Sequence, residues 1–228
     1  LQSPAVMLDV VKRLHLDVGY KTDGTFYKKV LYGQTLPVNV TFCDLQDNET
    51  AEMVIEPLED GRFSLSELVL NDEEVTPYTL PEATLNDTVQ TPVGRVLLTP
   101  SPYYREGLKS PLYVTRSTLH AATEGYMRNL TVSLSDEKAT VINLSFKDVC
   151  IQRAEDVLNT VIAVYNENWI KDKNQIAVST SMFINERLGV IEGELGNVDE
   201  DISSYKSEHL LPDVQAAANL YMAQSSET

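Results

Sequence analysis

The sequence predicts an α+β fold in which an α/β base, with a mixed sheet and packed helices, carries a β-rich insertion and a C-terminal helical arm. Three observations favour this class. Apolar residues recur at helical spacing near the N-terminus, at strand-like spacing over residues 36–99, and again at helical spacing after residue 148. The 228 residues are 43% hydrophobic and 23% charged, which is enough material to bury a core in one or two domains.

A first helix is expected over residues 4–16. Ser3 is a suitable N-cap, and Pro4 suits the first helical position because an N–H there would have no partner within the helix. The apolar residues that follow at helical spacing are Met7, Val10, Val11 and Leu14. This helix should therefore bury one face against the rest of the base.

Residues 36–99 have the two-residue period of strands. Turn-forming residues separate the short apolar stretches, and Asp60 followed by Gly61 indicates a hairpin. The expected strands lie at 38–42, 53–55, 63–65, 68–70 and 94–98. Residues 44–87 contain 13 acidic and one basic side chain, so this antiparallel β module should hold most of the negative charge.

A β-α-β-β order is expected next. A strand at 112–115 precedes a helix capped by Ser117, and two further strands at 130–134 and 140–146 are joined by a polar turn. Asp148 can cap another helix. The apolar stripe of that helix consists of Ala154, Val157, Leu158, Val161, Ile162 and Tyr165. We expect this stripe to pack on the sheet, with the first helix beside it.

The C-terminal part of the chain has a heptad pattern that predicts self-association. Its apolar residues alternate spacings of four and three, as in a coiled-coil seam. The proposed seam consists of Ile184, Leu188, Ile191, Leu195, Val198, Ile202 and Tyr205. Gly189, Gly193 and Gly196 each cost a helix about 1 kcal/mol relative to alanine, so they either strain this helix or permit close approach of a neighbour. Pro212 should break it before a last helical pattern over residues 214–221.

These patterns divide the chain into three expected parts. Residues 1–43 and 110–185 form the α/β base, residues 44–109 form the acidic β-rich insertion, and residues 186–228 form a truncated helical arm. The longest apolar runs are far shorter than the roughly 20 residues of a membrane span, so any membrane anchors would lie outside this sequence.

The charge and the absent motifs limit the chemistry. A net charge of −16 disfavours a nucleic-acid partner. The sequence has no phosphate-binding loop, no dinucleotide fingerprint, no HExxH or comparable metal spacing and no GxSxG elbow. We therefore expect no catalytic residue, no cofactor and no metal. Cys43 and Cys150 fit no zinc spacing, and both a pair of free thiols and a disulfide stay open.

Several segments carry a resemblance to a known family. They are Ser-Pro-Ala-Val-Met-Leu-Asp-Val-Val-Lys-Arg-Leu at 3–14, Thr-Pro-Val-Gly-Arg at 91–95, Ala-Glu-Asp-Val-Leu-Asn at 154–159 with Val-Tyr-Asn-Glu at 164–167, Phe-Ile-Asn-Glu-Arg-Leu at 183–188, and Glu-Leu-Gly-Asn-Val-Asp at 194–199. Together they resemble the extracytoplasmic region of the polysaccharide co-polymerases, the Wzz/Wzc-type chain-length determinants, in the branch associated with bacterial tyrosine kinases.

The resemblance implies a non-catalytic domain at the periplasmic face of the bacterial inner membrane, in a parent protein anchored by flanking membrane helices. It implies homo-oligomeric assembly that regulates the chain length and export of surface polysaccharide, whether capsule, exopolysaccharide or O-antigen. The expected partners are further copies of the chain and the polymerase or export machinery, with the polysaccharide itself as an additional candidate.

Two alternatives stay open from the sequence. The chain could be the extracytoplasmic sensor region of a membrane tyrosine kinase, whose kinase domain would lie outside this sequence. It could also be a carbohydrate-binding module, in which the β-rich stretch and the pair Tyr103 and Tyr104 supply a groove.

Overall fold

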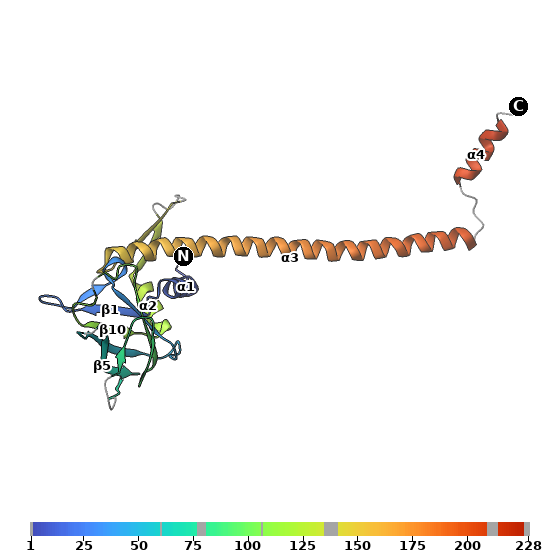
Figure 1. Cartoon of the computed structure of the whole chain (residues 1–228). Helices are drawn as coiled ribbons and strands as arrows, with labels where there is room; N and C mark the ends of the chain where they lie inside the picture. The colour runs from blue at the N-terminus through green and yellow to red at the C-terminus, as the bar shows by residue number, and fades with distance from the viewer. Residues whose placement is uncertain are drawn as a thin grey trace. The chain divides into compact units, whose positions relative to one another are not determined.

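The computed structural model describes residues 2–59, 61–76, 81–105, 107–134, 141–208 and 214–225, and it has the predicted α+β fold (Figure 1). It divides into two compact units, Leu1–Asn168 and Trp169–Thr228, which are described separately below. Two of the expected turns, at residues 135–138 and at Pro212, lie outside the described residues, as does the Asp60 half of the expected hairpin turn.

Helix α1 (Pro4–Leu14) begins as the sequence predicts. Ser3 is extended and Pro4 occupies the first turn. The helix ends two residues earlier than expected because His15 adopts the left-handed conformation, with φ of 50°, and its N–H bonds to the carbonyl of Lys12. The buried residues of the helix are Val6, Met7, Val10 and Val11.

The larger sheet has the order β2-β1-β10-β4-β5-β6. Its strands are β1 (Val18–Thr22), β2 (Lys29–Leu31), β4 (Ala51–Pro57), β5 (Phe63–Leu70), β6 (Glu73–Glu74) and β10 (Leu112–Arg116), and β7 (Glu82–Ala83) also pairs with β5. Every pairing recorded for the described residues is antiparallel, so the mixed sheet expected for the base is not found there. Where the structure describes them, the connections between these strands include no crossover of the kind that parallel neighbours require.

A smaller sheet has the order β3-β9-β8. Its strands are β3 (Val38–Phe42), β8 (Thr88–Thr91) and β9 (Gly94–Pro100). Val40 and Leu98 from this sheet share one hydrophobic core with Ile55 and Leu112 from the larger sheet. Strands expected for the base and strands expected for the insertion therefore form one core, and the compact unit does not divide at 43–44 or at 109–110.

A second core joins the helices of the first unit. Helix α2 (Leu119–Asn129) lies beside α1 (Figure 1), and it is capped by the hydroxyl of Thr118, one residue later than expected. The first turns of α3 (Ile151–Glu208) contribute Val157 and Val161 to the same cluster as Val10 and Val11 of α1. The predicted neighbourhood of the first helix and the helix after Asp148 is confirmed.

The buried stripe of α3 differs from the expected one. Val157, Val161 and Val164 are fully buried, whereas Ile162 and Tyr165 are 44% and 41% exposed. The valines are spaced by four and three, so they form one line along the helix, and Ile162 and Tyr165 lie one residue, or about 100°, away from it. The expected stripe combined two adjacent lines, of which one is buried.

The hairpin of β11 (Leu130–Leu134) and β12 (Ile142–Phe146) follows α2 and forms a separate two-stranded sheet. The ring of Phe146 stacks on Tyr126 of α2 with 5.9 Å between centroids. Asp148 accepts a hydrogen bond of 2.9 Å from the N–H of Cys150 at the start of α3. Both Cys43 and Cys150 are free thiols.

The second unit contains the remainder of α3 and helix α4 (Val214–Ser225). Helix α3 continues through Gly189, Gly193 and Gly196 without interruption. Among the described residues, no helix is both long and apolar enough to span a membrane.

Candidate functional site

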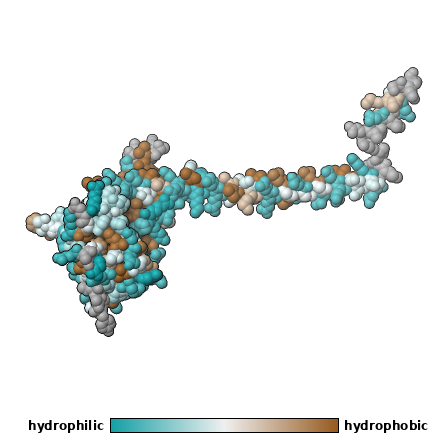
Figure 2. All heavy atoms as spheres, viewed as in Figure 1, coloured by the Kyte–Doolittle hydropathy of each residue, from teal (hydrophilic) through white to brown (hydrophobic). Residues whose placement is uncertain are grey.

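The seven residues of the predicted seam all lie on α3 in the second unit. Their side chains are about half exposed, from 46% for Ile191 to 58% for Leu195. Every described residue from Trp169 to Glu208 is classed as exposed, so no described part of the chain covers the seam. Apolar side chains recur along this helix in Figure 2. A stripe of this length exposed to water is typical of a helix that packs against a partner.

A second apolar line on the same helix was not predicted from the sequence. Trp169, Ile176, Phe183 and Val190 follow one another at intervals of seven residues, and each is between 47% and 61% exposed. Seven residues turn a helix by nearly two full turns, so these side chains form a line about 80° around the axis from the seam. A search of the sequence for apolar residues at seven-residue intervals from Trp169 would have identified this second line. The helix therefore has two adjacent apolar faces.

The three glycines lie on the side of α3 opposite the seam. Gly189 and Gly193 flank Ile191 by two residues on either side, which places both roughly half a turn away from it. A Cβ built on Gly189, Gly193 or Gly196 meets no atom within 4 Å. The glycines therefore do not provide close approach at the seam itself.

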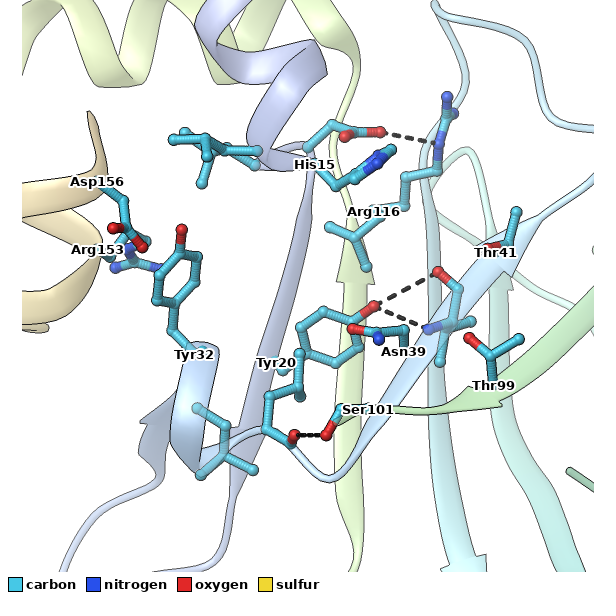
Figure 3. Close-up of a pocket in the computed structure, with 18 of the residues that line it drawn as sticks. His15, Tyr20, Tyr32, Asn39, Thr41, Thr99, Ser101, Arg116, Arg153 and Asp156 are labelled. Atoms are coloured by element: carbon cyan, nitrogen blue, oxygen red, sulfur yellow. Dashed lines mark hydrogen bonds and ion pairs between the residues drawn. The ribbon is translucent and has the colours of Figure 1, made fainter. Parts of the chain in front are cut away.

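The first unit holds a separate polar cleft with a volume of about 560 Å³. It is lined by the end of α1, strands β1, β3 and β9, the short 3₁₀ turn η1 (Gly33–Thr35), and the first turns of α3. Figure 3 shows polar and aromatic side chains from these elements converging on it. Its size is within the usual range for a small-molecule site.

One wall of the cleft is held by hydrogen bonds to the backbone (Figure 3). The hydroxyl of Tyr20 accepts a bond of 2.9 Å from the N–H of Val40 and donates to the carbonyl of the same residue. Burial raises the pKa of Tyr20 to about 12, so the phenol stays neutral. The hydroxyl of Ser101 donates to the carbonyl of Leu36 at 2.5 Å, which leaves it no proton for a neighbouring base.

The cations of the cleft are paired. Arg116 lies 3.5 Å from Asp17 and donates to the backbone carbonyls of Gln46 and Glu49 at 2.7 and 2.8 Å. Arg153 makes a bidentate pair with Asp148 at 2.6 and 2.7 Å. Both guanidinium groups are therefore committed to partners within the protein.

At the α3 side of the cleft, Tyr32 faces the carboxylate of Asp156. Burial raises the pKa of Tyr32, and its hydrogen bond to Asp156 raises it further. Next to it, the N–H of Gln34 bonds to the side-chain amide oxygen of Gln152 at 3.3 Å. Gly33 has φ of 54°, and its missing side chain leaves room for Gln152 to pack over the turn. The η1 turn is thus attached directly to α3.

Tyr103 and Tyr104, which the sequence suggested as part of a sugar-binding groove, lie in different surroundings in the structure. Tyr103 is 44% exposed and lines the cleft, whereas Tyr104 packs against the β core. The cleft residues from β1, β3 and α3 carry no motif in the sequence, because the fold alone brings them together. Within the described part of the chain, no group of three or more His, Cys, Asp or Glu side chains could hold a metal ion.

No family model matches the chain. A search of curated proteins finds the "Tyrosine-protein kinase ptk" of Acinetobacter johnsonii, 23% identical over 99% of this chain and 32% of that protein. The chain is similar to part of a bacterial tyrosine kinase. It spans about a third of the length of that curated relative.

The similarity includes both units, because it covers nearly the whole chain. It supports, at a general level, the resemblance to the kinase-associated branch of the polysaccharide co-polymerases. The phosphate-binding loops that a nucleotide site would need are absent from this sequence.

Proposed function

We propose that this chain is a non-catalytic extracytoplasmic domain that regulates the chain length and export of surface polysaccharide through homo-oligomeric assembly. It would act at the periplasmic face of the bacterial inner membrane, within a parent protein anchored by flanking helices. The observation that carries the proposal is the exposed seam on α3, because seven half-exposed apolar side chains in one heptad line favour a helical partner.

Two features of α3 favour further copies of the chain as that partner. The seam supplies one apolar face, and the line from Trp169 to Val190 supplies a second face about 80° away. A subunit in a closed ring must contact one neighbour on each side through different surfaces. A helix with two adjacent apolar faces meets this requirement, and a simple two-stranded coiled coil would need only one.

A second candidate function is the sensor region of a membrane tyrosine kinase. The name of the curated relative favours it, since that protein is described as a tyrosine-protein kinase and this chain matches about a third of it. In both functions this chain itself is non-catalytic and assembles, and they differ in whether the parent protein continues into a kinase domain. Sequencing the parental gene on both sides of this segment separates them.

Sedimentation velocity over a wide concentration range tests assembly through the seam. The unmodified chain should associate at high concentration, and Leu195→Glu with Ile202→Glu should stay folded and monomeric. The matched control is Ser203→Glu with Ser207→Glu, which adds the same charge to the same helix on the side away from the seam. Equal association of the seam variant and the unmodified chain would contradict the proposed interface.

The second apolar line has its own test. Phe183→Glu with Val190→Glu should also prevent assembly, because each contact in a closed ring would join the seam of one copy to the second apolar line of the next. In cells, the seam variant placed in the parental protein should change the length distribution of the surface polysaccharide. An unchanged distribution, with assembly lost, would contradict the regulatory function.

A further inference from the structure

Three side chains of the polar cleft have hydrogen-bonding groups that the protein does not use. Asn39 and Thr41 are two residues apart on β3, so both point to the same side of the sheet, and Asn39 lies directly opposite Thr99 of β9. Within the described part of the chain, none of these side chains makes a hydrogen bond. All three line the cleft (Figure 3).

These free groups are of one chemical kind. An amide and two hydroxyls each donate and accept, and none is charged. They sit on two strands whose backbones are already paired, so the backbone positions that carry them are fixed before any ligand arrives. Asn39 and Thr41 are exposed and Thr99 is partly buried, so all three are accessible to a ligand. An array of this kind suits a ligand whose own hydroxyl groups both donate and accept.

Aromatic rings form the other part of the cleft. Tyr103 exposes 44% of its surface at the rim, and Tyr32 and Tyr126 are half-buried on the side nearer α3. A flat ring offers an apolar face to the C–H groups of a sugar ring, while hydroxyls at the edge of the sugar reach the polar side chains. The lining therefore combines the two contacts that a pyranose needs.

The charges of the cleft argue against an anionic ligand. Arg116 is bonded to Asp17 and to two carbonyls, and Arg153 is bonded to Asp148. An acidic sugar would have to displace one of these pairs, and it would also face the carboxylates of Asp17 and Asp156. A neutral saccharide avoids both costs.

We propose that this cleft binds a short neutral segment of a polysaccharide, with Asn39, Thr41 and Thr99 bonding its hydroxyl groups and Tyr103 packing on one sugar ring. The inference rests on the proposed function only for the presence of a glycan near the protein. It adds a contact with the polymer itself, at a place separate from the seam residues on α3.

Saturation-transfer NMR and calorimetric titration on the whole chain test the proposal. The probes are the surface polysaccharide of the source bacterium cut to short oligosaccharides, the corresponding monosaccharides, maltotriose as a neutral oligosaccharide, and trigalacturonate as an acidic one. We expect a neutral oligosaccharide to bind more tightly than its monosaccharide. A failure of every oligosaccharide to bind, or binding of the acidic probe alone, would overturn the proposal.

Substitutions locate the binding. Thr41→Val with Thr99→Val keeps the shape and strand preference of both residues, and together with Asn39→Leu it should weaken binding at least tenfold. Tyr103→Ala should also weaken it. The matched controls are Thr131→Val and Tyr27→Ala, which change an exposed strand threonine and an exposed tyrosine outside the cleft. Equal losses in the cleft variants and the controls would overturn the assignment.

Binding of the oligosaccharide in the cleft should not depend on assembly through the seam. The seam variant Leu195→Glu with Ile202→Glu should bind the oligosaccharide with unchanged affinity, and the cleft variants should associate normally. Loss of assembly with binding retained supports the cleft and the seam as separate sites. Binding that disappears with the seam variant would place the glycan at the subunit interface and overturn the cleft.

Discussion

Arg13 of α1 and Glu167 of α3 form a bidentate ion pair, with nitrogen–oxygen distances of 3.0 and 2.6 Å. The pair joins residues 154 positions apart in the chain and lies at the edge of the helical core. Both side chains are about half exposed, so solvent screens their attraction. By contrast, Val157, Val161 and Val164 of α3 are fully buried, so these side chains should contribute more to the stability of the first unit than the ion pair does.

This difference predicts that Val161→Asp unfolds the first unit, whereas Glu167→Gln barely changes its melting temperature. A carboxylate at the fully buried position 161 would have no partner, and such burial costs several kcal/mol against a typical total stability of about 5–15 kcal/mol. Circular dichroism melts of both variants check the prediction. A native melting temperature for Val161→Asp would show that the assigned core face is wrong.

The stability of the first unit should fall in acid partly through Asp148. Burial acts to raise the pKa of Asp148, but hydrogen bonds from Arg153 and from the N–H of Cys150 outweigh it, so the pKa is lowered overall. A lowered pKa means that the charged form stabilises the fold above the unfolded-state pKa. This contribution is lost as the pH falls through the lower, folded-state pKa.

Urea unfolding between about pH 7 and pH 2 measures this contribution. The unmodified chain should lose more stability over this range than Asp148→Asn, because the variant has no carboxyl group to protonate at that site. Glu155→Gln, at an exposed position on α3 of the first unit, serves as the control and should follow the unmodified chain. If stability fell with pH to the same extent in the unmodified chain and in Asp148→Asn, Asp148 would not be a source of the acid sensitivity.

Replacing the three glycines of α3 by alanine should stabilise the helix without disturbing assembly. Each replacement should contribute about 0.5–1 kcal/mol, since alanine has the higher helix propensity and a Cβ meets no atom within 4 Å. Hydrogen exchange of the α3 amides in the whole chain measures the gain. Weaker association of this variant would instead indicate that a neighbouring helix packs on the glycine side.

Association should strengthen as salt is added. Residues 186–208 carry seven acidic and two basic side chains, so neighbouring copies of α3 repel one another at low ionic strength. Salt shortens the range of this repulsion to about 10 Å at 0.1 M and about 3 Å at 1 M, while the apolar contact persists. Sedimentation at low and high salt checks this. Dissociation on adding salt would point to ion pairs, rather than the apolar seam, as the main contact.

Local sequence patterns predicted the elements that depend on neighbouring residues. Ser3 and Pro4 indicated where α1 starts because the preference for proline in the first turn is local, although the Ser3 side chain makes no capping hydrogen bond. The two-residue period located β3 and β9, and the heptad spacing identified an apolar line on α3 whose residues are all exposed. Each of these signals depends only on the spacing of residues within one segment of the chain.

Pairing between distant segments needed the tertiary structure. Which strand lies beside β4 depends on the shared core of Met53, Ile55, Leu112 and Val114, and no local period encodes a partner 57 to 65 residues away. The same reason explains the cleft: Asn39, Thr99 and Asp156 come from three separate segments, and only the packing of β3, β9 and α3 brings them around one cleft. The sequence by itself therefore predicted the helices, the strands and the apolar line on α3. The cleft was decided by the tertiary structure, because a cleft forms only between elements that have packed together.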